Sequence, residues 1–306
     1  MRRMRTRSGA IVVAVLACAA LLAACSDGDD ADGGVSSAGR GPIGAGDQYV
    51  ALGDSYTSAP YVGKPVGPQG CLRTDANYPH LLAKKADLEL TDASCGGATT
   101  GDLQNAQDLV GHDGTVPAQL DAVSASTDLV TLSIGGNEGR MFGALVSTCV
   151  GLAQSQPDGA PCTKYAEADP EAYERRYAEI RSAIEQAVAQ IVARAPGVRV
   201  IVVGYPGVFP ERGTCDRLPL ATGDYPLARD VLQRLVKAQQ AAAEKADVEF
   251  VDVRPATKGH DICSDDPWVA GITTEKGRAG APYHPYREEQ QAVADVLAKV
   301  IAKPRR

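Results

Sequence analysis

A serine near the start of the chain follows a short apolar run. Residues 50–57 read Val-Ala-Leu-Gly-Asp-Ser-Tyr-Thr, so the run ends in Gly53-Asp54-Ser55. A serine at the end of a buried strand can be held by rigid backbone with its hydroxyl facing a cleft, as a serine nucleophile requires. Gly-Asp-Ser also makes an ordinary turn. The motif therefore predicts a nucleophile only if partner groups follow elsewhere in the chain.

Three further blocks contain groups that such a nucleophile would use. They read Ser-Cys-Gly-Gly-Ala-Thr-Thr over 94–100, Ile-Gly-Gly-Asn-Glu over 134–138 and Pro-Tyr-His-Pro over 282–285. Attack on an ester carbonyl leaves negative charge on oxygen, and losing one fixed N–H donor to that charge typically costs on the order of 100- to 1,000-fold in rate. The candidate donors are the main-chain N–H groups of Ser55 and Gly97 and the side-chain amide of Asn137. The alternative interpretation is that these blocks are ordinary strand-end turns.

One of the four histidines is the best candidate for the base. His284 precedes Pro285 at the start of the last helical segment, so its ring is fixed against a rigid backbone. His80 lies at a helix start and His112 in a Gly-His-Asp-Gly turn, so both are expected to be solvated or packing residues. His260, in a Gly-His-Asp sequence, is more ambiguous.

Strands alternating with helices must position these blocks. A helix is expected over 169–195, opened by Asp169-Pro170 and stopped by Pro196-Gly197, with further helices over 227–246 and 286–302. Alternation of this kind is typical of a parallel sheet covered by helices, with active sites at the carboxyl ends of the strands. Several of the strands are nearly continuous in Val, Ile and Leu, as expected for burial on both faces. The five expected strands are Tyr49–Leu52, Leu88–Ala93, Leu129–Ile134, Val198–Tyr205 and Val248–Val253.

The order and spacing of the four blocks resemble the SGNH hydrolases, also called GDSL lipases and esterases. The resemblance covers essentially all of residues 47–302 and is greatest to secreted actinobacterial members. It implies an α/β fold, a three-layer α/β/α sandwich with a central five-stranded parallel sheet, and hydrolysis of acyl esters without cofactor or metal. Carried onto this sequence, it implies Ser55 as nucleophile, His284 as base, and an oxyanion hole from the Ser55 amide, Gly97 and Asn137.

Two positions depart from the family pattern. Many members have an aspartate three residues before the catalytic histidine, where this chain has Ala281. The main-chain carbonyl of Ala281 could orient His284 instead, as is thought for some related enzymes. A carboxylate from the preceding loop is the other possibility, from Asp261, Asp265 or Asp266. The usual Asn-Asp pair is Asn137-Glu138, which is expected to affect loop packing more than chemistry.

The first residues are expected to be a targeting signal. Residues 1–24 combine arginines with an apolar stretch, and Leu-Ala-Ala-Cys over 22–25 resembles the lipobox of bacterial lipoproteins. That resemblance implies cleavage before Cys25 and lipid attachment to its thiol; a plain secretory signal is the alternative. Residues 25–46 are predicted to be a flexible, lipid-anchored tether, and residues 47–306 the hydrolase domain.

Six cysteines remain in the expected domain, an even number that suggests disulfides in an exported chain. Fifteen connectivities are possible, and sequential pairing, which closes short loops, is our prediction. No Cys-x-x-Cys pair occurs, and the histidines do not cluster with the cysteines, so a zinc site is not expected. The predicted pairs are Cys71–Cys95, Cys149–Cys162 and Cys215–Cys263.

Composition limits the partners. Loss of the four signal arginines changes the formal charge from −7 to −11, and no basic run follows, so nucleic acid is not an expected partner. We expect a monomer that acts on a lipid, sugar or small ester at the outer surface of the cell membrane, or free in the medium. Residues 60–77 and 138–166 are expected to be loops that shape the pocket. Two alternatives stay open, namely a sugar or cell-wall O-deacetylase and a non-catalytic binding lipoprotein of the same fold.

Overall fold

A computed structural model describes residues 41–305, which are built around a five-stranded sheet. The strands lie in the order β2-β1-β5-β6-β7, and every neighbouring pair is parallel. The expected parallel sheet is therefore confirmed, with each strand end within two residues of its predicted position. The strands are β1 (Gln48–Gly53), β2 (Glu89–Asp92), β5 (Leu129–Ser133), β6 (Arg199–Val203) and β7 (Glu249–Val251).

The central strands are buried on both faces, whereas both edge strands are only partly buried, with two of the three β7 residues half-buried. All residues of β5 and β6 are buried, and β1 is buried after its first residue. The β2 edge strand instead alternates between exposed and half-buried residues. The apolar runs of β1, β5 and β6 thus hold the middle of the sheet between two helical layers.

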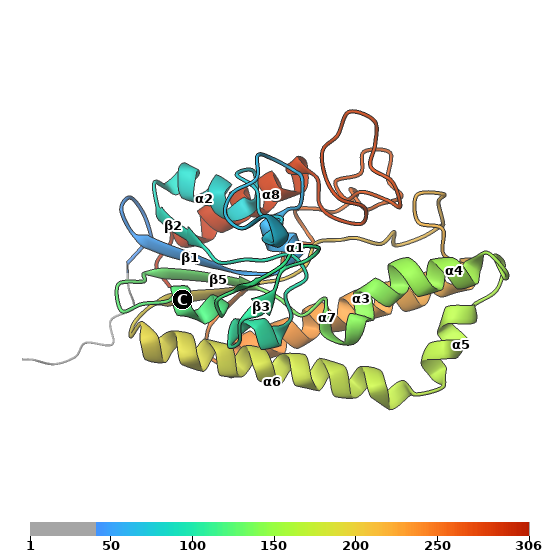
Figure 1. Cartoon of the computed structure of the whole chain (residues 1–306), viewed down its shortest axis with the longest axis horizontal. Coiled ribbons are helices and arrows are strands. Elements are labelled where there is room, and N and C mark those ends of the chain that lie inside the picture. The colour runs from blue at the N-terminus through green and yellow to red at the C-terminus, as the bar shows by residue number, and fades with distance from the viewer. Residues whose placement is uncertain (1–40, 306) are drawn as a thin grey trace, which may run out of the picture. The chain divides into compact units, whose positions relative to one another are not determined.

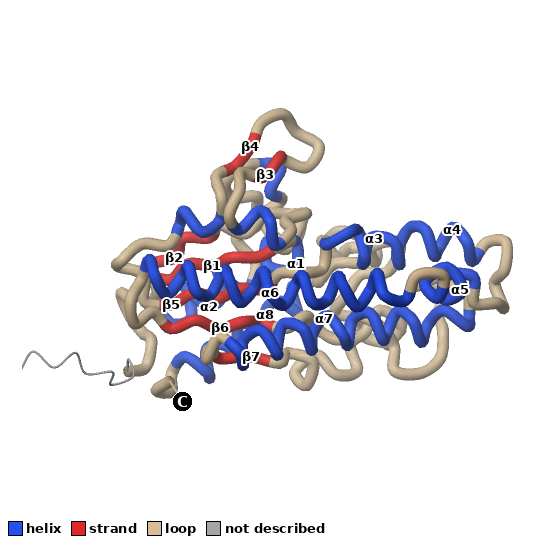
Figure 2. The backbone as a smooth tube through the Cα atoms, turned by 90° about the horizontal axis from the view of Figure 1, so that it is seen from below, coloured by secondary structure: helices blue, strands red, loops and turns tan. Residues whose placement is uncertain are grey.

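Four helices form those layers, as Figures 1 and 2 show from two directions. Helices α6 and α7 pack on one face of the sheet through the larger apolar cluster. Helices α2 and α8 cover the other face through a second apolar cluster. The expected three-layer sandwich is confirmed. The helices are α2 (Tyr78–Ala86), α6 (Pro170–Arg194), α7 (Tyr225–Lys245) and α8 (Arg287–Ile301).

The local signals read from the sequence explain the α6 bounds. The Asp169 side chain caps the helix by accepting a hydrogen bond from the Ala172 N–H at 3.1 Å, and Pro170 occupies the first turn. The chain leaves the helix before Pro196, and Gly197 has a positive φ of 82°. Its buried stripe recurs at helical spacing through Tyr177, Ile180, Ile184, Val188 and Ile191.

Residues 138–166 are largely helical rather than the expected loop. They contain α3 (Met141–Ala144), a π-helical turn (Leu145–Cys149), α4 (Val150–Ala153) and α5 (Pro161–Glu167). A distant carboxylate fixes the start of α5, because Asp224 accepts hydrogen bonds from the main-chain N–H groups of Cys162 and Thr163 at 3.0 and 2.8 Å. The smaller elements are α1 (Ser55–Ser58) and an antiparallel ribbon of β3 (Gln107–Asp108) and β4 (Thr115–Val116).

The domain begins earlier than predicted. Ile43 is buried in the cluster beneath α2 and α8, and its N–H donates to the Ile301 carbonyl at 2.9 Å. The prediction of a flexible tether up to residue 46 is therefore wrong for its last residues, because a single large apolar side chain anchors them. The predicted signal (1–24), Cys25 and the rest of the tether up to residue 40 lie outside the described residues. Among the helices of residues 41–305, none is long and apolar enough to cross a membrane.

A buried arginine binds the end of the last helix, at the place where Ile43 also contacts Ile301. Arg199, at the start of β6, makes a two-point contact with Glu249 at 2.7 and 2.8 Å. It also donates to the main-chain carbonyls of Ile301 and Lys303 at 3.1 and 2.7 Å. These partners satisfy a guanidinium that would otherwise be costly to bury.

The three predicted disulfides are confirmed. Cys71–Cys95, Cys149–Cys162 and Cys215–Cys263 are each bonded, with sequence separations of 24, 13 and 48 residues. The first joins the segment after α1 to the Gly-Gly turn after β2, and the second joins the π-helical turn to α5.

Of the three disulfides, Cys215–Cys263 closes the longest loop, so its removal should destabilise the domain most. Chain-entropy arguments give about 4 kcal/mol for a loop like Cys215–Cys263 and about 3 kcal/mol for one like Cys149–Cys162. Urea unfolding of the two double Cys→Ser variants measures the difference, each serving as the other's control. A larger loss for the Cys149–Cys162 pair would contradict the expectation.

Candidate active site

Ser55 lies at the carboxyl end of β1, where a rigid turn leads into α1. Asp54 caps α1 by accepting the Tyr56 N–H at 2.9 Å. The buried Gln119 side chain bonds both main-chain groups of Gly53, at 2.8 and 2.9 Å. A Cβ on Gly53 would lie 2.6 Å from the Ser133 carbonyl, so only glycine fits here. The sequence thus folds into a turn that holds Ser55 in one place.

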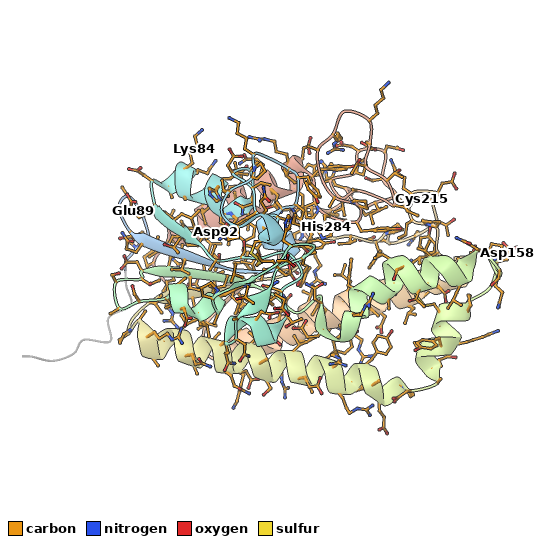
Figure 3. All side chains as sticks on the ribbon, viewed as in Figure 1. Lys84, Glu89, Asp92, Asp158, Cys215 and His284 are labelled. Carbon is orange, nitrogen blue, oxygen red and sulfur yellow. A yellow bond between two sulfur atoms is a disulfide. The ribbon has the colours of Figure 1, made fainter. Side chains whose placement is uncertain are left out.

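His284 reaches Ser55 from the other end of the chain, and Figure 3 shows it beyond the strand ends, beside α1. Its Nε2 lies 2.8 Å from Ser55 Oγ, and its Nδ1 lies 2.8 Å from the Pro282 carbonyl oxygen. A carbonyl only accepts hydrogen bonds, so Nδ1 carries the proton and Nε2 is left to accept from the serine hydroxyl. Burial lowers the pKa of His284, and the bond to Pro282 opposes this shift.

The carbonyl that orients His284 is not the one expected. Ala281 accepts from the His284 main-chain N–H at 3.2 Å, whereas the ring bonds the carbonyl of Pro282. Sequence reasoning named the right kind of group one residue too early, because a turn at 281–284 directs the two carbonyls differently.

Two of the three candidate carboxylates, those of Asp261 and Asp266, have partners of their own. Asp261 accepts the Cys263 N–H at 2.8 Å, and Asp266 Oδ2 accepts the Trp268 indole N–H at 3.2 Å. The Asp266 carbonyl oxygen lies 2.8 Å from His260 Nδ1. The ring of His260 stacks on Trp268 at 3.7 Å. Within residues 41–305, no carboxylate is hydrogen-bonded to His284.

The candidate oxyanion donors lie on adjoining turns. Gly97 has a positive φ of 76°, and neither its N–H nor that of Ser55 has an acceptor in the described part of the chain. Asn137 donates one amide hydrogen to the Ala98 carbonyl at 2.9 Å, which leaves the second hydrogen for a substrate. Asn137, Ser55 and His284 line one cavity, whereas Gly97 is an exposed residue outside its lining.

Glu138, the departure beside Asn137, joins the same two turns. Its Oε1 accepts the main-chain N–H of Thr100, and its Oε2 is buried without a partner among residues 41–305. Burial raises the pKa of this carboxyl above its ordinary value. The residue thus fixes the turn that bears Gly97 to the turn that bears Asn137.

Tyr205 is a site residue that the motifs did not reveal. Its hydroxyl donates to Asp54 Oδ2 and accepts the Gly136 N–H at 2.9 Å, so it joins two of the strand-end blocks. Burial raises the pKa of Asp54 to about 7, although the Tyr205 bond lowers it. In the sequence, the only indication that Tyr205 belongs to the site was its position at the end of the predicted strand Val198–Tyr205.

The cavity beside Ser55 has a volume of about 140 Å³. One wall comes from α3 and the following turn, namely Phe142, Gly143 and Val146, as expected for the segment 138–166. The expectation for residues 60–77 is wrong, since none of them lines it. An engineered apolar cavity of about 150 Å³ in another protein holds benzene, which sets the scale of the group that this one accommodates.

Known proteins resemble this chain over most of its length. Residues 51–300 match the GDSL-like Lipase/Acylhydrolase family model. Lipase 2 of Streptomyces coelicolor is 37% identical over 83% of this chain and 85% of its own length. The crystal structures of an extracellular lipase from Streptomyces rimosus and of phospholipase A1 from Streptomyces albidoflavus NA297 each superpose with a TM-score of 0.63 and 27% identity, over 83% of this chain and 99% of theirs. The chain therefore belongs to the GDSL-like lipase/acylhydrolase family and is a carboxylic ester hydrolase.

Proposed function

We propose that the protein cleaves its ester substrates with Ser55 as nucleophile and His284 as general base. The observation that carries the proposal is the 2.8 Å contact between Ser55 Oγ and a His284 Nε2 that has a free lone pair. A nucleophile and base in hydrogen-bond contact, with the base oriented by a third group, is the arrangement that activates a serine hydroxyl.

The steps follow from the positions of these atoms. Ser55 Oγ attacks the ester carbonyl carbon while its proton passes to Nε2. Negative charge on the carbonyl oxygen is stabilised by the N–H groups of Ser55 and Gly97 and by the Asn137 amide. Collapse of this intermediate expels the alcohol, which takes the proton from Nε2 and leaves an acyl-serine. Water then attacks the acyl-serine as its proton passes to His284 Nε2. Collapse of the second intermediate breaks the bond to Ser55 Oγ, which takes the proton back from Nε2, and the carboxylic acid departs.

The cavity supports an acyl chain as the group beside Ser55. Phe142, Gly143 and Val146 present an apolar wall, which suits a hydrocarbon chain better than the hydroxyl-rich ring of a sugar ester. The Ser55–His284 contact supports turnover rather than binding alone. The deacetylase and binding-lipoprotein alternatives therefore receive no support from a specific observation.

We infer that the protein is exported. The related Streptomyces rimosus lipase is described as extracellular, and disulfides are typical of exported chains. Attachment of lipid to Cys25 is a further proposal that rests on the sequence 22–25 alone. The mass of the mature N-terminal peptide tests this proposal. A peptide that begins with lipid-bearing Cys25 would support it, and a peptide without lipid would indicate a plain secretory signal instead.

Ser55→Ala should reduce ester hydrolysis at least about a thousandfold, because removal of the nucleophile leaves only binding and the oxyanion donors. The matched control is Ser58→Ala on the same helix, whose hydroxyl has no hydrogen-bond partner within the described residues. Turnover of a p-nitrophenyl ester and labelling by a fluorophosphonate probe measure the effect. Retention of more than about one percent of activity in Ser55→Ala would exclude Ser55 as nucleophile.

Activity should persist below pH 6.5 and then fall. His284 accepts the serine proton only when its ring is neutral, and burial lowers its pKa from the ordinary value of 6.5. The value of kcat/KM should therefore decrease tenfold per pH unit below that lowered pKa. Asp54, with a pKa of about 7, is the competing titrating group near Ser55. An acid limb near pH 7 that disappears in Asp54→Asn would assign the limb to Asp54 instead.

Gly143→Leu should shorten the acyl chains that the enzyme accepts. Gly143 lines the cavity, and a Cβ at this helical position would meet nothing nearer than 4.0 Å, so a side chain can enter the cavity. We expect kcat/KM for an octanoyl ester to fall at least about tenfold, roughly 1.4 kcal/mol, with little change for an acetyl ester. Gly151→Leu on α4 is the control, because a Cβ there also meets nothing within 4 Å but lies outside the cavity lining. Equal losses for both esters would contradict the acyl assignment.

A further inference from the structure

Tyr56 follows the proposed nucleophile in the sequence, yet its side chain contacts the segment that bears the proposed base. Its hydroxyl donates to the Tyr283 carbonyl at 2.9 Å. Its ring centroid lies 5.6 Å from that of His284. One side chain thus joins the two halves of the Ser55–His284 pair.

The turn that carries His284 has an uncommon backbone. Its ends are joined by the hydrogen bond from the His284 N–H to the Ala281 carbonyl at 3.2 Å. Pro282 occupies the second position, and Tyr283, at the third, has a positive φ of 61°. Proline followed by a positive φ is the signature of a type II turn, where the third residue is usually glycine. A tyrosine in this conformation is strained, and the surrounding structure must hold it there.

That conformation decides where the Pro282 carbonyl points. Type I and type II turns differ mainly in the orientation of the central peptide, which here joins Pro282 to Tyr283. With Tyr283 at positive φ, the Pro282 carbonyl meets His284 Nδ1 at 2.8 Å. If Tyr283 relaxed to negative φ, this peptide would rotate and His284 would lose its acceptor.

Two hydrogen bonds from outside the turn oppose that rotation. The Tyr283 N–H donates to the Gly271 carbonyl at 3.1 Å, and the Tyr283 carbonyl accepts from the Tyr56 hydroxyl. Tyr56 is itself fixed, because its N–H donates to Asp54 and its carbonyl accepts from Gln290 of α8 at 3.0 Å. Its ring packs edge-on against Tyr205 and Phe142, with centroids 5.2 and 6.0 Å away.

We infer that Tyr56 is a positioning residue whose hydroxyl keeps the Pro282 carbonyl directed at His284. The inference rests on the proposed function, since it concerns the orientation of the proposed base. In this chain the turn and Tyr56 together orient the His284 ring, which is the role of the aspartate in many members of the family.

Tyr56→Phe tests the inference, because it removes the hydroxyl and keeps the ring. We expect kcat to fall at least about tenfold while KM changes less than about twofold. The bond to Pro282 favours the protonated ring, so its loss should also move the acid limb of the pH profile to lower pH. The other titratable groups around the pair are Asp54, Tyr205 and Tyr283, together with Glu289 of α8, which acts electrostatically on Tyr56. The phenylalanine variant leaves all of them in place.

Tyr177→Phe is the matched control. Tyr177 is also buried, and its hydroxyl also donates to a main-chain carbonyl, that of Val231 at 3.3 Å, but it lies on α6 outside the cavity lining. Thermal unfolding of both variants shows whether each is folded and how much stability it loses. Should Tyr56→Phe unfold, ¹⁵N NMR of wild-type His284 provides the second measurement, and absence of a proton on Nδ1 would overturn the inference.

The outcomes separate the two proposals. The inference is overturned if Tyr56→Phe keeps wild-type kcat and pH profile while Ser55→Ala is inactive. It is also overturned if Tyr177→Phe loses kcat equally, since the effect would then be one of stability alone. Activity retained in both Ser55→Ala and His284→Ala would instead overturn the proposed function.

Discussion

The 2.8 Å contact between Ser55 and His284 constrains the whole fold, because its two partners are 229 positions apart in the sequence. The sheet meets this constraint by placing β1, from the start of the domain, between β2 and β5. The last helix then packs over the same strands, and its Gln290 bonds the main chain of both Tyr56 and Tyr78. The parallel order of the strands brings the remaining site residues to the same edge, since each follows a strand.

The absence of an aspartate before His284 changes the electrostatics of the whole site. A carbonyl dipole stabilises an imidazolium less than a full negative charge does, so the proposed mechanism depends more on the proposed oxyanion donors and on the exact orientation of the His284 ring. Two buried carboxyls adjoin Ser55 and Tyr56, and burial raises the pKa of Asp54 to about 7 and that of Glu289 to about 8. Both therefore favour the neutral form at moderately acid pH. Within residues 41–305, His284 is thus hydrogen-bonded to a backbone carbonyl and to Ser55, and not to a carboxylate.

The sequence was sufficient for the sheet, because apolar runs mark the strands. It was sufficient for the contact between Ser55 and His284, because both residues lie in blocks whose order and spacing resemble those of a known family. It was insufficient for the Pro282 carbonyl, since one peptide orientation separates it from Ala281 and the strained Tyr283 has no signal in a residue pattern. Helix α5 was missed for another reason. Its first turn is held by Asp224, more than sixty residues away, and local periodicity cannot reveal such a contact. Ile43 was likewise one apolar residue in a stretch whose composition suggested only a tether.

The hydrogen bond between Ile43 and Ile301 closes the domain at its two ends, and this has a consequence for the newly made chain. Ribosomes make Ser55 early and His284 much later, followed by the helix that packs beside β1. A chain made only as far as β7 therefore carries Ser55 without its contact to His284 and without α8 of its core. On the proposed mechanism, such a chain cannot hydrolyse esters until His284 and α8 have been added.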